Sequence, residues 1–182
     1  MLALNDALQI YALVALLRRQ NANGINSRLS KAGAATATAA AQNAMIAYLV
    51  TLVARAYAEP KQGDLHLRAG AEMLKVDKTS REIFDSGNKP KKVADFEEHW
   101  AKCRADHRLA KIKSFRDKQT AHLGIAENVL EPEYRELFEF GEATAQAMEF
   151  LALATGVAVN PIAGNNDAIA SAEAFWKPWT TD

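Results

Sequence analysis

The 182-residue sequence contains a single cysteine, Cys103. One thiol excludes an internal disulfide and also a zinc site built from several cysteines. Such sparing use of cysteine is typical of proteins in a reducing compartment. We therefore expect the protein to be cytoplasmic.

The sequence has no net charge either, and its N-terminal apolar run is short. The chain has 22 basic and 22 acidic residues, so no overall field attracts it to nucleic acid or to an anionic membrane. The apolar run Leu8–Leu17 has about half of the roughly 20 residues needed to span a bilayer. Arg18 and Arg19 follow this run, whereas a secretory signal carries its basic residues first. We expect a buried or dimer-facing first helix, no membrane partner, and only a local site for any polyanion.

Alternating runs of β-branched residues, the usual signal of a strand, are missing as well. Helical periodicity dominates, so the sequence predicts an all-α protein, an antiparallel bundle of four to five main helices. The expected helices cover residues 4–20, 34–58, 69–84 and 93–123, and a last one that Glu131-Pro132-Glu133 opens and Gly156 ends. After the turn at residues 21–24 we expect a polar loop.

The predicted domain organisation has two parts. Residues 1–156 form the helical bundle, for which residues 33–156 are the best supported. Residues 157–182 are a C-terminal appendage, whose aromatic end, Ala174–Trp179, either docks on the body or binds a partner.

Glycine-rich phosphate loops, nucleophile elbows and His-Glu-x-x-His zinc motifs do not occur, which leaves one chemically suggestive pair, Arg116 and His122. An arginine can clamp a phosphate through a fixed fork of donors, and a histidine can move protons near neutral pH. These two groups suffice in principle to cut RNA without a metal, with the 2′-hydroxyl as the nucleophile. The pair therefore suggests a nuclease.

The spacing of this pair affects how a site can form. Six residues turn a regular helix through about 240°, so Arg116 and His122 do not share a face. Convergence requires a long arginine side chain, a distorted helix end, or a second copy of the helix across a two-fold axis. We expect a homodimer whose interface includes this helix.

Basic residues crowd the same stretch of the chain. Residues 102–118 hold seven lysines and arginines against two aspartates, while residues 127–149 hold seven glutamates against one arginine. One interpretation makes the basic stretch an RNA-binding track, with the candidates Arg108, Lys111, Lys113 and Lys118. The other pairs the two stretches in ordinary surface salt bridges, and the charge pattern alone favours it because solvated charged faces are common.

His99, Cys103 and His107 follow one another at four-residue spacing and superficially suggest a metal site. Phe96 and Trp100 share their helical stripe, so core-facing histidines are the better interpretation. We predict no metal and no cofactor.

The segment Phe115-Arg116-Asp117-Lys118-Gln119-Thr120-Ala121-His122 resembles the motif of the HEPN superfamily (higher eukaryotes and prokaryotes nucleotide-binding), especially its abortive-infection, AbiU-like branch. That motif is an arginine, a polar residue and then a histidine. Leu130–Leu137, which includes Pro132, is similar to the entry to the final helix of this branch. The resemblance covers about residues 34–156 and is strongest over 111–153.

Known members of the superfamily are all-α and usually dimeric, and many are metal-independent ribonucleases of toxin–antitoxin, phage-defence or RNA-processing systems. The resemblance implies that Arg116 and His122 are catalytic and that Asp117 orients them. It also implies an RNA substrate, and an antitoxin or a nucleotidyltransferase-type protein as a candidate partner.

Two alternatives stay open beside the ribonuclease, because a fold does not fix a function. The same fold can serve as a non-catalytic module that binds nucleic acid or protein. In that case Arg116 and Asp117 form an internal ion pair and His122 merely packs. The other alternative is a structural homodimer of helices.

Overall fold

The computed structural model describes residues 2–22, 24–76, 90–120, 132–157 and 161–180, and every regular element among them is helical. This confirms the all-α prediction. The elements are α1 (Leu2–Gln20), α2 (Ile25–Lys31), α3 (Ala35–Ala56), α4 (Leu67–Val76), α6 (Pro90–Ala105), α7 (Arg108–Thr120), α8 (Tyr134–Ala154), α9 (Pro161–Trp176) and a 3-10 turn, η1 (Lys177–Trp179).

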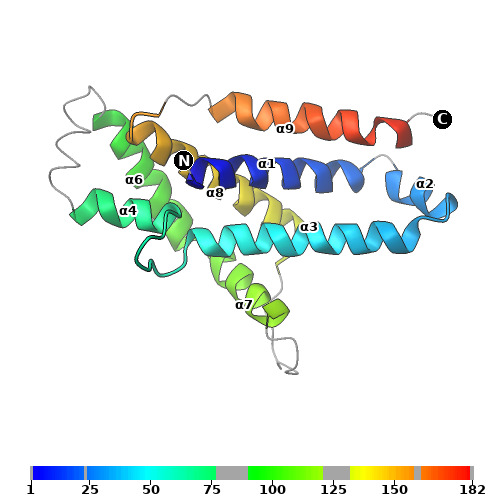
Figure 1. Ribbon diagram of the computed structural model, residues 1–182, viewed down its shortest axis with the longest axis horizontal. Coiled ribbons are helices and arrows are strands. Elements are labelled where there is room, and N and C mark those ends of the chain that lie inside the picture. The colour runs from blue at the N-terminus through cyan, green and yellow to red at the C-terminus, as the bar shows by residue number, and fades with distance from the viewer. Residues whose placement is uncertain (1, 23, 77–89, 121–131, 158–160, 181–182) are drawn as a thin grey trace.

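The centre of the molecule is built around α1, which packs against α3, α8 and α9. Figure 1 shows α3 running back antiparallel to α1, while α9 runs in the same direction as α1 on its other side. Helix α6 packs on α8, and α7 packs on α3 and α8. The common core is aliphatic where α1 meets α3, as at Ile10 and Leu49, and aromatic where α6 meets α8, as at Trp100 and Phe140.

Helix α8 begins where the sequence predicts. Pro132 precedes a reciprocal capping box, in which the Glu133 side chain accepts from the backbone of the third helical residue and the Glu136 side chain accepts from the backbone N–H of Glu133. The helix ends at Ala154, and Gly156 follows with a φ of 87°, a left-handed conformation that favours glycine.

The predicted helix over residues 93–123 is wrong, because the chain breaks at Asp106 and His107 into α6 and α7. The Asp106 carboxylate accepts a hydrogen bond from the backbone N–H of Arg108 at 2.9 Å, as an aspartate does at the start of a helix. The side chain thus begins a second helix inside a stretch whose periodicity suggested one. The rest of the predicted span, residues 121–123, lies outside the described residues.

The expected polar loop after Gly24 is also wrong, because residues 25–31 form α2. Its Ile25 and Leu29 are buried against Trp176 at the far end of the chain. Trp176 donates from Nε1 to the Leu16 carbonyl at 3.0 Å, and Arg28 donates to the Trp179 carbonyl at 3.0 Å. The aromatic end therefore docks on the body, and the division of the chain at residue 156 stays a prediction.

Helix α3 is, within the described ranges, the one helix long and apolar enough to cross a membrane by composition. Its second half supplies Ile46, Leu49, Leu52 and Val53 to the core of the bundle, which accounts for the apolar character. The shorter helix predicted over residues 69–84 is observed as α4, and the predicted residues after Val76 lie outside the described ones.

Candidate functional site

Helix α7 carries the candidate residues and rests on the bundle by its apolar side. Ile112 is fully buried in the core, and Leu109 and Phe115 pack against it. Figure 1 shows the C-terminal end of α7 pointing away from α1, α3 and α9. The helix therefore presents its polar side chains on either side of a buried stripe, near one extremity of the molecule.

Arg116 lies in the last turns of α7 and is half-buried, with 32% of its side chain exposed. Its Nε and Nη2 both donate to Oδ1 of Asp117, at 2.8 and 2.5 Å. His122 lies outside the described residues. The structure thus brings together Arg116 and Asp117 of the predicted catalytic set, and the predicted roles of all three residues stay predictions.

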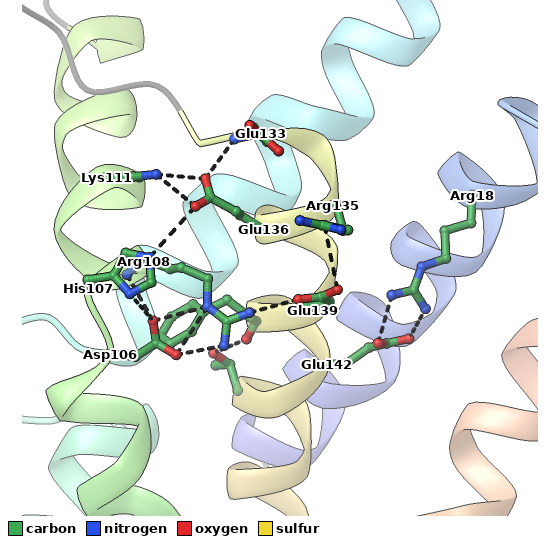
Figure 2. Close-up of polar contacts among 12 residues, drawn as sticks. Arg18, Asp106, His107, Arg108, Lys111, Glu133, Arg135, Glu136, Glu139 and Glu142 are labelled. Carbon is green, nitrogen blue, oxygen red and sulfur yellow. Dashed lines mark hydrogen bonds and ion pairs between the residues drawn. The ribbon is translucent and has the colours of Figure 1, made fainter.

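On the side of α7 that faces α8, the basic residues meet glutamates (Figure 2). Lys111 Nζ donates to both carboxylate oxygens of Glu136, at 2.7 and 2.9 Å. Arg108 donates to Glu139 at 3.1 Å and, from Nη2, to Asp106 at 2.6 Å. Lys111 and Arg108, two of the four RNA-binding candidates, therefore form salt bridges with carboxylates, as the second interpretation of the charge pattern expects.

These contacts shift the ionisation of the partners. Hydrogen bonds from Arg108 are the main cause that lowers the pKa of Asp106, and hydrogen bonds from Lys111 are the main cause that lowers the pKa of Glu136. The bond to Asp106 likewise raises the pKa of Arg108. All of these groups are charged at neutral pH, so this side of α7 is locally compensated.

Lys113 lies in a different environment. It is half-buried, and burial is the first cause that lowers its pKa; the charges of Arg68, Arg116 and Arg104 lower it further, while Glu59 opposes them. Arg68 comes from α4 and Arg104 from α6, so three helices contribute cations here. The remaining candidate, Lys118, is exposed near the end of α7.

Sequence reasoning did not single out Arg68 or Arg104 as site residues. Arg104 was visible only as one member of the basic stretch. Arg68 lies about 45 residues upstream of Lys113, and no local pattern links the two. A signal for Arg68 could have come only from knowing that α4 and α7 both pack on α8.

The two histidines of the predicted stripe differ in burial. His99 is half-buried, and its Nε2 lies 3.0 Å from the Ala143 carbonyl oxygen, as expected of a core-facing side chain. The prediction for His107 is wrong: its side chain is 76% exposed, because the break between α6 and α7 takes it off the stripe. Cys103 is buried, and burial raises the pKa of its thiol. The described residues hold no group of three or more potential metal ligands.

Comparison with known proteins identifies the family of the chain. The family model of the HEPN domain of AbiU2 matches residues 2–171. The match is wider than the resemblance over residues 34–156 and takes in α1 and most of α9. No curated protein and no solved structure matches the chain. Since the match spans nearly the whole all-helical fold, the protein belongs to the AbiU2 family of HEPN domains.

Proposed function

We propose that the protein is a metal-independent ribonuclease of a toxin or phage-defence system, and that Arg116 and His122 cut the RNA. The observation that carries this proposal is the family match over residues 2–171, which encloses the arginine and histidine motif. The half-buried position of Arg116 beside Lys113 supports it, because a partly desolvated cation interacts more strongly with a phosphate than an exposed one.

In the proposed reaction the 2′-oxygen of a ribose attacks the adjacent phosphorus and the bond from phosphorus to the 5′-oxygen breaks. His122 takes the 2′-hydroxyl proton or gives a proton to the leaving 5′-oxygen. Arg116 donates to the phosphoryl oxygens as negative charge builds on them. The products of this step are a 2′,3′-cyclic phosphate and a 5′-hydroxyl.

Asp117 holds the Arg116 guanidinium in the structure, and we propose that it orients this group until RNA binds. Asp117 is 64% exposed, and exposed ion pairs contribute only about 0–1 kcal/mol. A phosphate can therefore take over the guanidinium at little cost. This exchange makes the ion pair compatible with catalysis.

We further propose that the active form is a homodimer in which two copies of α7 approach each other. The spacing of about 240° between Arg116 and His122 on a regular helix motivates this, because one copy alone does not bring the two groups to one face. A cytoplasmic location and an antitoxin or nucleotidyltransferase-type partner belong to the same proposal. Light scattering that finds only a monomer at micromolar concentration would contradict the composite site.

The catalytic roles are tested by cleavage of single-stranded RNA in the presence of a chelator. His122→Ala and Arg116→Ala should each lower the rate by about 10²-fold or more, and the chelator should have no effect. Arg116→Lys should also lose most activity, because a point charge does not reproduce the bidentate fork.

Arg135→Ala is the matched control, because Arg135 is 80% exposed on α8 and its loss should leave the rate unchanged. Circular dichroism should show the same helical content for all variants. Cleavage that persists in the Arg116→Ala and His122→Ala double variant would assign the activity to other residues.

A second function is favoured by one specific contact. The Arg116 and Asp117 ion pair is the arrangement expected of a non-catalytic binding module with the same fold. The two functions differ in the fate of bound RNA: the module binds varied RNAs and leaves them intact, whereas the ribonuclease shortens them.

A further inference from the structure

We propose that the phosphates of bound RNA lie on a patch formed by Arg68 of α4, Arg104 of α6, and Lys113 and Arg116 of α7. We call this set the cationic patch. The inference rests on the proposed function in one respect, that RNA is the ligand. It assigns the direction in which the strand leaves Arg116, toward α4 and α6 and away from the basic residues that face α8.

The first argument is the shared location of the four cations. Lys113 and Arg116 are three residues apart on α7 and therefore neighbours on one face of that helix. Arg68 and Arg104 lie close enough to Lys113 for their charges, together with that of Arg116, to lower its pKa. Arg104 lies in the last turn of α6, next to the start of α7, and Arg68 pairs at 2.7 Å with Glu59, whose charge also acts on Lys113. Three helices thus contribute cations near one half-buried lysine.

The second argument is that two of these cations form no close ion pair with a carboxylate. Within the described residues, neither Arg104 nor Lys113 forms an ion pair. The Arg104 guanidinium lies instead over the ring of Trp100, 5.8 Å from its centroid. The charge of Glu59 only partly offsets the cations around Lys113, so an anion that binds among them relieves their mutual repulsion.

The carboxylates near the patch are weakly placed to compete with a phosphate. Arg68 pairs with Glu59 at 2.7 Å and with Glu72 at 2.8 Å, and these glutamates are 80% and 46% exposed. Pairs with such exposed carboxylates contribute little and are screened by salt. A phosphate chain that contacts several cations at once gains more by releasing its counterions.

Within the described part of the chain, the surface beside Arg104 offers no free aromatic face on which a base could stack. An open hollow of about 520 Å3 lies on α6, lined by Glu97, Trp100, Ala101, Arg104 and Ala105. The Trp100 ring is 4% exposed and stacks on Tyr57 at 5.2 Å between centroids, so it offers no free face to a base. Contacts to phosphate and sugar carry no sequence information. The patch should therefore bind single strands without sequence preference.

The test measures RNA binding separately from cleavage, in the full chain carrying His122→Ala. The ligand is a fluorescent single-stranded RNA of mixed sequence, titrated between about 50 and 200 mM salt. Two double variants are compared. Each removes two positive charges, one variant from the cationic patch and the other from the side of α7 that faces α8. One is Arg104→Gln with Lys113→Gln; the other is Arg108→Gln with Lys111→Gln.

The patch variant should weaken binding by about 10-fold and lower the salt slope by about 1.4, the value for two phosphate contacts to a single strand. The variant of the side that faces α8 should change affinity by less than about 3-fold, because its cations are already paired. Arg68→Gln alone should give a loss of intermediate size. Melting curves must show folded protein, and glutamine keeps most of each apolar stem.

Equal losses in the two double variants, a larger loss in the second, or no RNA binding at all would overturn the inference. The proposed function fails separately. If the chain with His122 intact binds RNA through the patch but never cuts it, the inference holds and the ribonuclease proposal does not. If that chain cuts RNA, and the patch variant cuts and binds RNA as well as the parent does, the ribonuclease proposal holds and the inference does not.

Discussion

The two sides of α7 carry the same kinds of residue in opposite electrostatic settings. Arg108 and Lys111 face α8, where Glu139 and Glu136 neutralise them. Lys113 lies instead near the cations Arg68 of α4, Arg104 of α6 and Arg116 of α7. A positive charge in the sequence therefore says little about its availability to a ligand, because the neighbouring helices decide whether it is compensated.

The α6 side also rests on aromatic packing, and the largest effect we predict tests how much the fold depends on it. Trp100 stacks between Tyr57 and Phe96 and lies beneath Arg104. Trp100→Ala should lower the free energy of unfolding by about 3–5 kcal/mol, as buried aromatic truncations do. Urea unfolding measures this. A loss below about 1 kcal/mol would show that the α6 side does not depend on its aromatic core.

A smaller loss is expected at the break between α6 and α7. Asp106→Ala removes the side chain that begins α7 and also the close partner of Arg108, so unfolding should become easier by about 1 kcal/mol. Asp106→Asn should recover part of this, because asparagine is also a good residue at a helix start. If alanine and asparagine behave alike, the cap does not matter.

The compensated side can be converted into a binding surface. Glu136→Gln should free Lys111, whereas Asp106 still holds Arg108, so affinity for single-stranded RNA should rise by about 3-fold and the salt slope by about 0.7, the value for one phosphate contact to a single strand. The measurement is the same titration in the His122→Ala chain. Glu173→Gln, at an exposed position of α9, is a control for the loss of a glutamate as such. Unchanged affinity would mean that Lys111 cannot reach RNA even when it is free.

The smallest effect concerns acid stability. The pKa values of Asp106 and Glu136 are lowered in the folded chain, so the stability they contribute is present at neutral pH and is lost as the pH falls below about 4. Lys113 has its pKa lowered too, but a lysine is charged when protonated, so its contribution is destabilising at neutral pH and disappears as the pH rises through its folded pKa toward the usual lysine value. Thermal melts of the parent and of Asp106→Asn should converge as the pH falls. Parallel curves would argue against this linkage.

Local signals in the sequence predicted several elements because their causes are local. Pro132 and the glutamates after it mark the start of α8, and Gly156 marks its end. The break at Asp106 was missed although aspartate is a typical first-turn signal, because the apolar residues continue at helical spacing across it.

The candidate site was predictable only in part. Arg116 and Asp117 follow from a short motif, but the neutralisation of Lys111 by Glu136 and the approach of Arg68 to Lys113 are tertiary contacts. The charge pattern predicted ion pairing between the two stretches, yet it did not say which cations would be paired. That distinction needs the tertiary packing that places α4, α6, α7 and α8 relative to one another.

The central claim, RNA cleavage by a 2′-hydroxyl mechanism, is tested most directly by the ends of the products. A single-stranded RNA and its fully 2′-deoxy counterpart should be incubated with the purified chain in a chelator, and the fragments analysed by mass spectrometry. The account predicts RNA fragments that carry 2′,3′-cyclic phosphate and 5′-hydroxyl ends, an intact DNA strand, and no fragments with His122→Ala. Cleavage of the DNA strand, or RNA products with 5′-phosphate ends, would contradict it.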